Sequence, residues 1–454
     1  MDTEKVLTDG KIKIRLIGMS RSPDNRAGAD EICVAGALGC FEGKSSHVLL
    51  EELKDLPEDK KEKKLERLCA ETSGRGHGSV LDQSVFVFSI EDLPRAVTLQ
   101  LCLPEYLSLL QQSLRRADAD RGVYLPDSIL NSDRRNEVED AVQEAFSFYD
   151  MARNEGVPAE DARYPLPLAT RTNIQVLGDP RELMHLHAMS RRAAVPAVAR
   201  EVVQGMIDQA LSAAPHIMKE RERGYEVLAW RPAAQLFAAE NPFLSRLAAE
   251  KGKSGNAVLM DYASIDIRQE EVDAAVRGDE ALLANLKHIH FTFLASMSLN
   301  AFHQAIRQRT WHQSVQSIYN ALDRNERVVP PKVRIAGLAE KMNRVHDRLV
   351  DLAVHLPQQA DIPPGDAVLV APQSLGVYDL IHTDGWNALH AIGKRTCVEA
   401  QWEIRDLANE MAEAIRGTGS PIGRWVYPQG VIYGVCPERD CCGLCNKILE
   451  KIER

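Results

Sequence analysis

The chain of 454 residues lacks several features that would each indicate a class of protein. No apolar run reaches the roughly eighteen residues that a membrane span needs. The first residues do not combine a basic stretch with an apolar one, as a secretory signal does. Positive charge is in deficit, with a formal net charge of −10, whereas broad nucleic-acid binding requires a basic face. We therefore expect a cytoplasmic protein that binds neither membranes nor nucleic acid.

The sequence also lacks a Ser-His-Asp or Cys-His arrangement of the kind that activates a covalent nucleophile. Its hydrophobic content of 44% and charged content of 26% are those of a globular protein. The length exceeds one ordinary core, so two or three domains are expected. The charge deficit does not exclude a small basic pocket, because two or three arginines suffice to bind one phosphate group.

The nine cysteines of a cytosolic chain are more often thiols or metal ligands than disulfides. Four lie within ten residues near the C-terminus: Cys436, Cys441, Cys442 and Cys445. Four thiolates can bind zinc or an iron–sulfur cluster. The adjacent pair Cys441 and Cys442 is awkward for a tetrahedral site, and the spacing fits no standard pattern. The cluster is therefore a candidate metal site, with a thiol-rich tail, or ligands completed by another chain, as the alternatives.

Two stretches 204 residues apart resemble one motif written twice. The first contains, in order, Gln100, Leu103, Pro104, Glu105, Ser113 and Arg115. The second contains, at the same offsets, Gln304, Arg307, Gln308, Arg309, Ser317 and Tyr319. Each copy keeps residues that the other has lost. This complementary loss predicts one shared site built from two halves.

Each copy of the motif follows an apolar segment that alternates in the manner of a β-strand, at 84–90 and at 288–294. A helix should follow each strand. The first helix would end near Ser113, and the second, capped by Ser296 or Ser298, would carry Gln304 and Arg307 on one face. Further along each half we expect a long amphipathic helix, near 191–211 and near 395–415. A strand at 11–16 and a solvated helix at 51–66 complete this outline.

The distance from Gln100 to Arg191 is 91 residues, and the distance from Gln304 to Arg395 is also 91. Equal spacing between matched features is the mark of an internal duplication. Glycine, proline and asparagine interrupt the pattern near 240–255, so we expect domains at 1–245 and 246–454. The expected fold class is α+β: two tandem domains, each with a small, mostly antiparallel sheet and long helices.

These segments resemble the flavin-dependent thymidylate synthases, whose motif has the form R-H-R-x-x-S-x-N-x-x-S-x-R-Y. The matching residues are Ser108, Ser113 and Arg115 in the first half, and Arg307, Arg309 and Ser317 in the second. The family's downstream motif, R-x(4)-A-Q-x-E-I-R, is matched closely from Arg395 to Arg405. Gly76-His77-Gly78-Ser79 resembles its upstream G-H-x-S. The resemblance covers most of the chain, as two tandem copies.

The chain also departs from the family's pattern. The first half lacks both arginines of the R-x-R, and the second half has no G-H-x-S before its strand. In the second half, Gln308, His312 and Tyr319 stand where the family has His, Ser and Arg. These departures put the substrate, and catalysis itself, in doubt.

The resemblance implies a flavin enzyme that methylates C5 of a uracil nucleotide, most simply dUMP to dTMP. It would use FAD, with NADPH and a reduced folate as co-substrates. A reduced flavin carries the hydride, so the protein would mainly orient and polarise the pyrimidine. One alternative is another pyrimidine nucleotide, such as UMP in specialised metabolism. The other is a non-catalytic paralogue that binds a flavin or a nucleotide.

Residue roles follow from the resemblance alone. The implied nucleotide-binding residues are Ser113, Arg115, Arg163, Gln304, Arg307 and Arg395, of which Gln304 and Arg395 are also the implied catalytic residues. The implied flavin-binding residues are His77, Ser79, Asp82, Arg307 and Arg309. Family members form homotetramers with sites between subunits, so a fused pair predicts a homodimer.

Structural roles are the alternatives for several of these residues. Arg307 and Arg309 could form surface ion pairs. Ser113 and Ser317 could cap helix ends. Arg395 and Glu399, four residues apart, could pair along an exposed helix.

Overall fold

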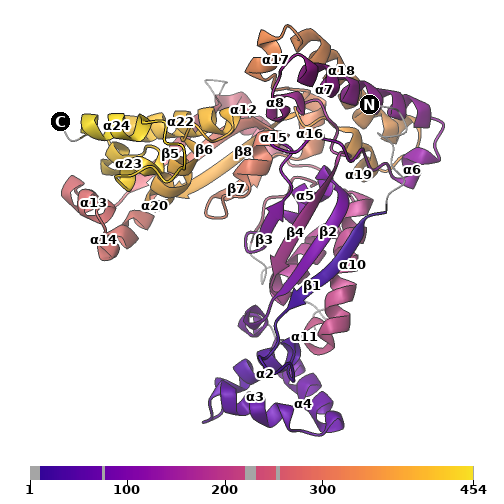
Figure 1. The fold of residues 1–454 in the computed structure, drawn as a ribbon, viewed down its shortest axis with the longest axis vertical. Helices are drawn as coiled ribbons and strands as arrows, with labels where there is room; N and C mark the ends of the chain where they lie inside the picture. The colour runs from indigo at the N-terminus through magenta and orange to yellow at the C-terminus, as the bar shows by residue number, and fades with distance from the viewer. Residues whose placement is uncertain (1–10, 74–76, 220–231, 252–255, 453–454) are drawn as a thin grey trace. The chain divides into compact units, whose positions relative to one another are not determined.

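The computed structural model describes residues 11–73, 77–219, 232–251 and 256–452. The chain divides into two compact units, shown in Figure 1. Unit 1 comprises Met1–Ala233 and Arg348–Ala371, and unit 2 comprises Ala234–Asp347 and Pro372–Arg454. Each unit contains a four-stranded antiparallel sheet and several helices. The expected α+β class with two small antiparallel sheets is confirmed.

The strands and helices of unit 1 are, in chain order, β1 (Lys13–Met19), α2 (Ala29–Gly39), α3 (Ser46–Lys54), α4 (Glu58–Glu71), η2 (Gly78–Gln83), β2 (Phe86–Pro94), α5 (Arg95–Leu101), β3 (Ser108–Gln111), α6 (Asp127–Leu130), α7 (Arg135–Asn154), α8 (Ala159–Ala162), β4 (Arg171–Gly178), α9 (Pro180–Ser190), α10 (Ala197–Ala213) and α11 (Pro215–Lys219). From the later part of the chain, unit 1 also holds the end of α18 (Ala339–Gln359), with α19 (Pro364–Ala367) and η6 (Val368–Val370).

The strands and helices of unit 2 are α12 (Pro242–Lys251), β5 (Ala257–Ser264), α13 (Gln269–Val276), α14 (Glu280–Asn285), η5 (Leu286–His288), β6 (Ile289–Ser298), α15 (Leu299–Ala305), β7 (His312–Val315), α16 (Ile318–Arg324), α17 (Pro331–Ile335), the start of α18, β8 (Gly376–Asp384), α20 (Gly385–Asn387), η7 (Ala388–Ile392, a π-helical turn), α21 (Gly393–Arg395), α22 (Trp402–Gly417), η8 (Pro421–Trp425), α23 (Gln429–Ile432) and α24 (Leu444–Ile452). Within the described part of the chain, no helix combines the length and the apolar character that crossing a membrane requires.

The two sheets have the same strand order, β1-β2-β4-β3 in unit 1 and β5-β6-β8-β7 in unit 2. In β2, Phe86, Phe88 and Ile90 are fully buried and alternate with partly exposed residues. In β6, Phe291 and Phe293 are likewise fully buried and alternate with partly exposed residues. Successive side chains of a strand point to opposite faces, so one face of each sheet forms a core. The expected strands at 84–90 and 288–294 are confirmed.

In each unit a central strand passes directly into a helix. β2 ends at Pro94 where α5 begins, and β6 ends at Ser298 where α15 begins. The first two N–H groups of each helix donate to carbonyls of the loop that leads into the next central strand. These bonds are Arg95 to Thr170 (3.0 Å), Ala96 to Leu168 (3.1 Å), Leu299 to Leu375 (2.9 Å) and Asn300 to Gln373 (3.2 Å). The loop therefore satisfies backbone groups that a helix start otherwise leaves unpaired.

The registers of the two sheets show that the repeat shifts by one residue. β3 and β7 begin at Ser108 and His312, which are 204 residues apart. The residues that face them, Leu177 and His382, are 205 residues apart. One residue has therefore been gained in the second half, or lost in the first, between the strand–helix junction and the last central strand.

This shift corrects one match made from spacing alone. Arg191 is the C-cap of α9, and the corresponding C-cap at the end of α21 is Thr396. Arg395 comes one residue earlier, so its counterpart in unit 1 is Ser190 and the match to Arg191 was wrong. The shared strand order of the two sheets supports the duplication. The identical spacing of 91 residues was coincidental.

Several expected helices are shorter than their sequence pattern indicated. α5 ends at Leu101, and the strand β3 occupies part of the segment expected to stay helical as far as Ser113. α15 ends at Ala305, so Gln304 is helical and Arg307 is not. The solvated segment expected at 51–66 belongs to two helices, α3 and α4, because Pro57 lies between them and a proline fits only the first turn of a helix.

The expected domain boundary at 245/246 stays a prediction about the duplicated halves. The compact units differ from it, because residues 348–371 of the second half belong to unit 1. Arg348 forms an ion pair with Glu144 of α7 at 2.7 Å, and Asp366 accepts from Ser128 at 2.7 Å. The amide of Leu168 donates to the carbonyl of Ala371 at 2.9 Å. These contacts attach a segment of the second half to the sheet unit of the first.

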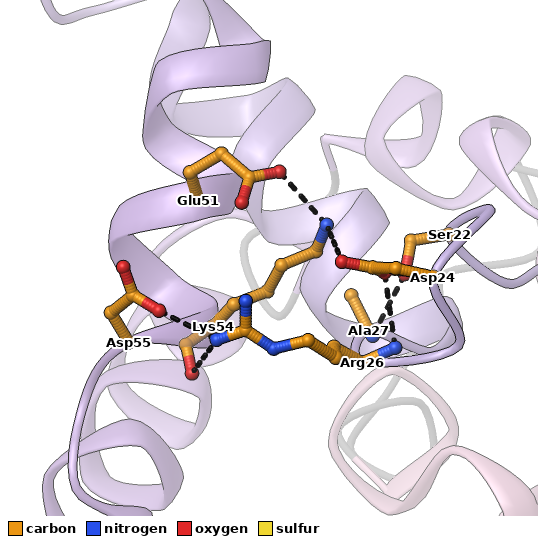
Figure 2. A network of polar contacts seen from close by, with 7 residues as sticks. All are labelled: Ser22, Asp24, Arg26, Ala27, Glu51, Lys54 and Asp55. Atoms are coloured by element: carbon orange, nitrogen blue, oxygen red, sulfur yellow. Dashed lines mark hydrogen bonds and ion pairs between the residues drawn. The ribbon is translucent and has the colours of Figure 1, made fainter.

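A polar network, shown in Figure 2, attaches the loop after β1 to the end of α3. Lys54 Nζ donates to Asp24 at 2.9 Å and to Glu51 at 2.8 Å. Hydrogen bonds from Ser22 and then from Lys54 hold the pKa of Asp24 well below its usual range. The network ends at Ala27, two residues before α2 begins, and α2 packs against η2.

One buried carboxyl group in unit 2 has no hydrogen-bond partner within the described part of the chain. Asp379 of β8 is fully buried, and neither of its oxygens is bonded. It faces Val315 of β7, and the residue at the same register position in unit 1 is Ile174. Burial raises the pKa of Asp379 to about 8, so the group is mostly neutral at pH 7.

Asp379 should make the stability of unit 2 depend on pH. Its folded-state pKa of about 8 lies above the ordinary 3.8, so between these values the folded form holds a proton that the unfolded form has released. The contribution of Asp379 to stability is therefore greatest below pH 4 and falls as pH rises towards 8, by up to about 1.4 kcal/mol per pH unit. Asp379→Asn should remove this slope.

Urea unfolding followed by tryptophan fluorescence measures this effect, because Trp311, Trp386, Trp402 and Trp425 all lie in unit 2. Asp261→Asn, in the same sheet but exposed, is the matched control. An Asp379→Asn variant that keeps the wild-type pH slope would contradict the assignment.

Candidate functional site

The residues implied in nucleotide and flavin binding are divided between the units. Unit 1 holds His77, Ser79, Asp82, Ser113, Arg115 and Arg163, and unit 2 holds Gln304, Arg307, Arg309 and Arg395. Each set is therefore described within its own unit. The expected sharing of one site between the halves stays a prediction.

Ser113 and Arg115 lie in the turn that follows β3. The exposed Ser113 hydroxyl accepts from the Arg115 amide at 3.2 Å. Arg115 Nε donates to the Glu160 carboxylate at 2.9 Å, and both side chains are 29% exposed. A half-exposed guanidinium next to an exposed hydroxyl has the donors that a phosphate group requires. Ser113 does not cap a helix, so the structural alternative for it fails.

Arg163 is the C-cap of the short helix α8 and is 4% exposed. Its Nε donates to the Glu160 carbonyl at 3.3 Å. Burial lowers the pKa of Arg163, and the charge of Arg115 acts in the same direction. Glu160 thus contacts both arginines, one through its side chain and one through its backbone.

In unit 1 the part of the motif around Gln100 is buried. Gln100 is 1% exposed and donates to the Ser190 hydroxyl at 3.1 Å. Leu103 and Pro104, which stand where the second copy has Arg307 and Gln308, are buried. This half of the first motif is therefore part of a protein core and cannot present charge to a ligand.

His77, Ser79 and Asp82 are exposed and lie on one short element. His77 is the N-cap of η2, which carries the other two residues. Asp82 forms an ion pair with Arg181 of α9 at 3.3 Å. Gly76 of the predicted G-H-x-S lies outside the described residues. The element offers both donors and acceptors, which suits a polar cofactor without identifying one.

In unit 2 the R-x-R segment follows α15 directly. Arg307 and Arg309 are both exposed, in the turn between α15 and β7. Because the helix ends at Ala305, Arg307 does not share a helical face with Gln304, and that expectation was wrong. The turn instead places two guanidinium groups beyond the helix end, where they reach solvent.

Two contacts join the R-x-R segment to the downstream motif. Gln304 Nε2 donates to Gln401 Oε1 at 3.4 Å. With the Gln308 amide turned so that its oxygen faces Arg395, that oxygen accepts from Nε at 3.1 Å and from Nη2 at 2.6 Å. The sequence analysis treated Gln308 only as a departure from the family's histidine. In this orientation Gln308 bonds to two nitrogens of Arg395 and restricts that side chain.

The downstream motif also fixes the start of α15. The buried Glu403 accepts from the amide and from the hydroxyl of Ser298, both at 2.6 Å. Ser298 in turn caps α15 by accepting from the Ala301 amide at 3.2 Å, which confirms one of the two expected caps. Pro94 takes this cap position in unit 1 and has no side-chain donor or acceptor. The clamp between Ser298 and Glu403 is thus a feature of unit 2.

The remaining motif positions of unit 2 are structural or altered. Ser317 is fully buried, donates to the Ala238 carbonyl at 2.6 Å and caps α16, so its structural alternative is confirmed. His312 is exposed and stacks on His382, with ring centroids 5.7 Å apart. Arg395 ends α21, and Glu399 lies in the turn that follows. The two residues therefore do not share one exposed helix.

The structure does not support the metal site expected at Cys436, Cys441, Cys442 and Cys445. Among the described residues, no three histidine, cysteine, aspartate or glutamate side chains are grouped so that they could hold a metal ion. Cys441 and Cys442 are exposed, whereas Cys445 is 5% exposed and close to Gly430. Cys436, Cys442 and Cys445 nevertheless line one small cavity, and Cys397 lines it with them.

Comparison with known proteins agrees with this geometry. The family model for the thymidylate synthase complementing protein, Thy1, matches residues 24–216 and 273–418. These two segments make up well over half of the chain. The chain belongs to this family.

Curated relatives of the Thy1 family carry the name flavin-dependent thymidylate synthase. The protein of Sulfolobus acidocaldarius is 32% identical over 146 residues, which are 32% of this chain and 56% of the relative. The protein of Geobacter sulfurreducens is 40% identical over 119 residues, 25% of this chain and 51% of the relative. The protein of Pyrococcus furiosus is 32% identical over 165 residues, which are 35% of this chain and 66% of the relative. The chain thus spans between about half and two thirds of the length of these relatives.

A solved structure also resembles part of this Thy1 protein. It is a UMP/dUMP methylase, PolB from Streptomyces cacaoi, bound with 5-Br dUMP. The identity is 19% and the TM-score 0.38, over 46% of this chain and 94% of the other. A likeness of this extent decides neither the fold nor the function.

The clamp between Ser298 and Glu403 should contribute measurably to unit 2 of this Thy1 protein. Glu403→Ala leaves two buried donors of Ser298 without an acceptor, which costs about 1–3 kcal/mol for each donor. The midpoint of urea unfolding, followed by tryptophan fluorescence, should fall accordingly. Glu413→Ala, an exposed residue of the same helix, should leave the midpoint within about 0.5 kcal/mol of wild type.

A double-mutant cycle with Ser298→Ala tests the pair directly. The two losses should be less than additive, because each single variant already breaks the same pair of bonds. Fully additive losses would show that the two residues act independently and would contradict the clamp.

Proposed function

We propose that the protein is a flavin-dependent enzyme that methylates C5 of a uracil nucleotide, most simply converting dUMP to dTMP. The observation that carries the proposal is the retention of the motif residues as two ordered sets. In unit 2, bonds within the family's own motifs orient Gln304 and Arg395. In unit 1, Arg115 and Arg163 both bond to Glu160, and the Ser113 hydroxyl bonds to the Arg115 amide. Family membership supports the same reading.

In this proposal the nucleotide is held mainly by charge-assisted hydrogen bonds. Ser113, Arg115 and Arg163 supply donors in unit 1. Arg307 and Arg395 supply guanidinium groups in unit 2, and Gln304 supplies an amide. Bidentate pairing with arginine suits a phosphate group. Arg395 is the best candidate to polarise the pyrimidine, because Gln308 restricts its orientation.

The flavin is assigned to His77, Ser79 and Asp82 on η2 and to Arg307 and Arg309 after α15. The exposed guanidinium groups fit a diphosphate, and the exposed polar groups of η2 fit a polar ring system. When bound, the flavin supplies the hydride. A reduced folate as the carbon donor and NADPH as the reductant belong to the proposal as well, and the protein's residues serve to bind, orient and exclude water.

A second substrate remains a candidate because of three residues in unit 2. Gln308, His312 and Tyr319 replace residues that family members usually carry, and His312 is exposed beside the R-x-R segment. Such changes suit another pyrimidine nucleotide, such as UMP. The same changes also fit a non-catalytic paralogue that binds a flavin or a nucleotide.

Reconstitution of the full chain with FAD tests the proposal. The protein should acquire a flavin absorption spectrum, oxidise NADPH, and form dTMP from dUMP in the presence of methylene-folate. Competition between dUMP and UMP in the same assay identifies the preferred nucleotide. If the chain binds flavin but shows no turnover with any pyrimidine nucleotide, the non-catalytic alternative is correct. A chain that binds no flavin would refute the enzyme, and one that binds neither flavin nor nucleotide would refute both.

Arg307→Met should weaken the affinity for dUMP by about tenfold or more, because a charge-assisted hydrogen bond contributes roughly 1.5–3 kcal/mol. Calorimetric titration of dUMP measures the effect. Arg116→Met is the matched control, since Arg116 is exposed in the motif region of unit 1 and has no assigned role. Equal losses in both variants would indicate a general effect of charge and would contradict the role of Arg307.

The proposal also includes a homodimer, in which two fused chains take the place of the family's four subunits. Light scattering during size-exclusion chromatography should give a mass of about twice the 50.5 kDa of the chain. A monomer at the same concentration would contradict it.

A further inference from the structure

The C-terminal part of unit 2 brings four cysteines to one small cavity. Cys436, Cys442 and Cys445 line it, and Cys397 joins them from the turn between α21 and α22. The cavity has a volume of about 10 Å³, which is close to the least space that a single water molecule needs. It has no room for an organic ligand, so any chemistry there belongs to the side chains that line it.

Two of these cysteines, Cys436 and Cys445, approach each other over a glycine. A Cβ built on Gly430 of α23 would lie 3.1 Å from Cys436 Cα, 3.2 Å from Cys445 Cβ and 2.7 Å from Cys445 Sγ. Cys436 Cα and Cys445 Cβ are therefore at most about 6 Å apart, which is compatible with the roughly 4.4–6.8 Å that a disulfide needs between its Cα atoms. The missing side chain of Gly430 leaves room for this approach.

The packing favours a bond between two thiols over a metal site. Cysteine metal sites use three or four protein ligands, and no three suitable side chains are grouped closely enough for this in the part of the chain that the structure describes. A disulfide needs only two thiols. Cys441 and Cys442 are exposed, and the sulfur of Cys441 accepts from the Gly443 amide at 3.4 Å. The shared contact with Gly430 therefore favours Cys436 and Cys445 over the other pairs.

The two thiols suit different steps of disulfide formation. Cys436 is partly exposed and accessible to a small reagent, whereas Cys445 is 5% exposed. Burial, and then the neighbouring Cys436, raise the pKa of the Cys445 thiol. A less acidic thiol leaves a disulfide more slowly, so a bond to Cys445 should resist reduction once it has formed.

We propose that Cys436 and Cys445 form a disulfide that fastens α24 to the segment after α23. The oxidant is a small-molecule disulfide such as oxidised glutathione. The Cys436 thiolate attacks it and releases one thiol, and the Cys445 thiolate then displaces the second thiol from the mixed disulfide. Two protein thiols are oxidised, one small-molecule disulfide is reduced to two thiols, and the two protons pass to the released thiols.

The disulfide acts on the part of unit 2 that carries the downstream motif. α23 and α24 pack against each other (Figure 1). Gln429 of α23 donates to the His390 carbonyl of η7 at 3.2 Å, and η7 continues into α21, which ends at Arg395. Oxidation therefore attaches the C-terminal helix to the segment that carries Arg395. The disulfide does not depend on the proposed function, because no nucleotide or flavin takes part in it.

The first experiment equilibrates the full chain with oxidised and reduced glutathione in varying ratio, alkylates the remaining thiols and digests with trypsin. Trypsin cuts after Arg439, an exposed residue between the two cysteines. The peptide that ends at Arg439 and holds Cys436 should stay joined to the peptide 440–447 until a reductant is added. If these peptides separate in the oxidised chain without a reductant, the proposal is overturned.

Single variants identify the partner of Cys436, because the peptide 440–447 also holds Cys441 and Cys442. The joined peptides should persist in the matched controls Cys441→Ser and Cys442→Ser and disappear in Cys445→Ser. If Cys445→Ser does not fold, the double variant with both controls leaves Cys445 as the only cysteine in that peptide, and the join should still form. Loss of the join in the controls would assign the bond to another pair and overturn the proposal.

A second experiment tests whether the bond holds α24. Hydrogen exchange of the amides in 444–452 should be about 10- to 100-fold slower in the oxidised chain, because the bond restricts the opened segment. In Cys436→Ser the same amides should exchange equally with and without oxidised glutathione. Equal rates in the oxidised and reduced wild type would overturn the fastening of the helix.

Elemental analysis of the purified chain distinguishes a disulfide from a metal site. The proposal expects no bound metal that depends on Cys436. Zinc that is lost in Cys436→Ser, and that protects the wild-type thiols from oxidised glutathione, would show that they are metal ligands and would overturn the disulfide.

Discussion

The organisation of both units depends on the junction where a central strand becomes a helix without an intervening loop. At Pro94 and at Ser298 the chain turns from sheet to helix within one residue. The first two amides of each new helix bond to the loop that enters the neighbouring strand. Because a helix start leaves amides that must find partners, this loop fixes the helix relative to the sheet. The motif residues of both halves follow from that fixed point.

The side chains around the strand–helix junction differ between the two units. In unit 2 the clamp between Ser298 and Glu403 and the bond between Gln308 and Arg395 hold polar side chains in defined orientations. In unit 1 the same region is apolar or closed, with Gln100 bonded internally to Ser190. The charged residues Arg115 and Arg163 lie instead beside Glu160. A duplicated scaffold has thus kept its backbone and divided its polar groups between the copies.

Buried polar groups mark where the halves differ most. Asp379 occupies a core position at which unit 1 has Ile174. Arg95, whose buried Nε has no hydrogen-bond partner within the described part of the chain, occupies a helix start at which unit 2 has Leu299. A buried group that lacks a partner is unfavourable for folding alone. Its retention in one copy only therefore indicates a role that the other copy does not share.

The local pattern of the sequence was sufficient for the strands, the fold class and the existence of the repeat. Alternation in 84–90 and 288–294 reflects the two faces of a strand, which neighbouring residues alone define. The motif matches also identified the family, because residue type and spacing survive without reference to the fold. The sequence did not locate the ends of the helices. α15 stops before Arg307, and α5 gives way to a strand that pairs with a distant one.

Tertiary structure alone decided which side chains lose contact with water and which partners they meet. Ser298 and Glu403 are 105 residues apart, and nothing local indicates that they bond. The one-residue shift between the repeats, which makes Ser190 the equivalent of Arg395, became visible only through the strand registers. Cys397 is distant in sequence from the four C-terminal cysteines, yet it lines one small cavity together with Cys436, Cys442 and Cys445. Periodicity is a property of adjacent residues, whereas burial and pairing are properties of segments brought together by the fold.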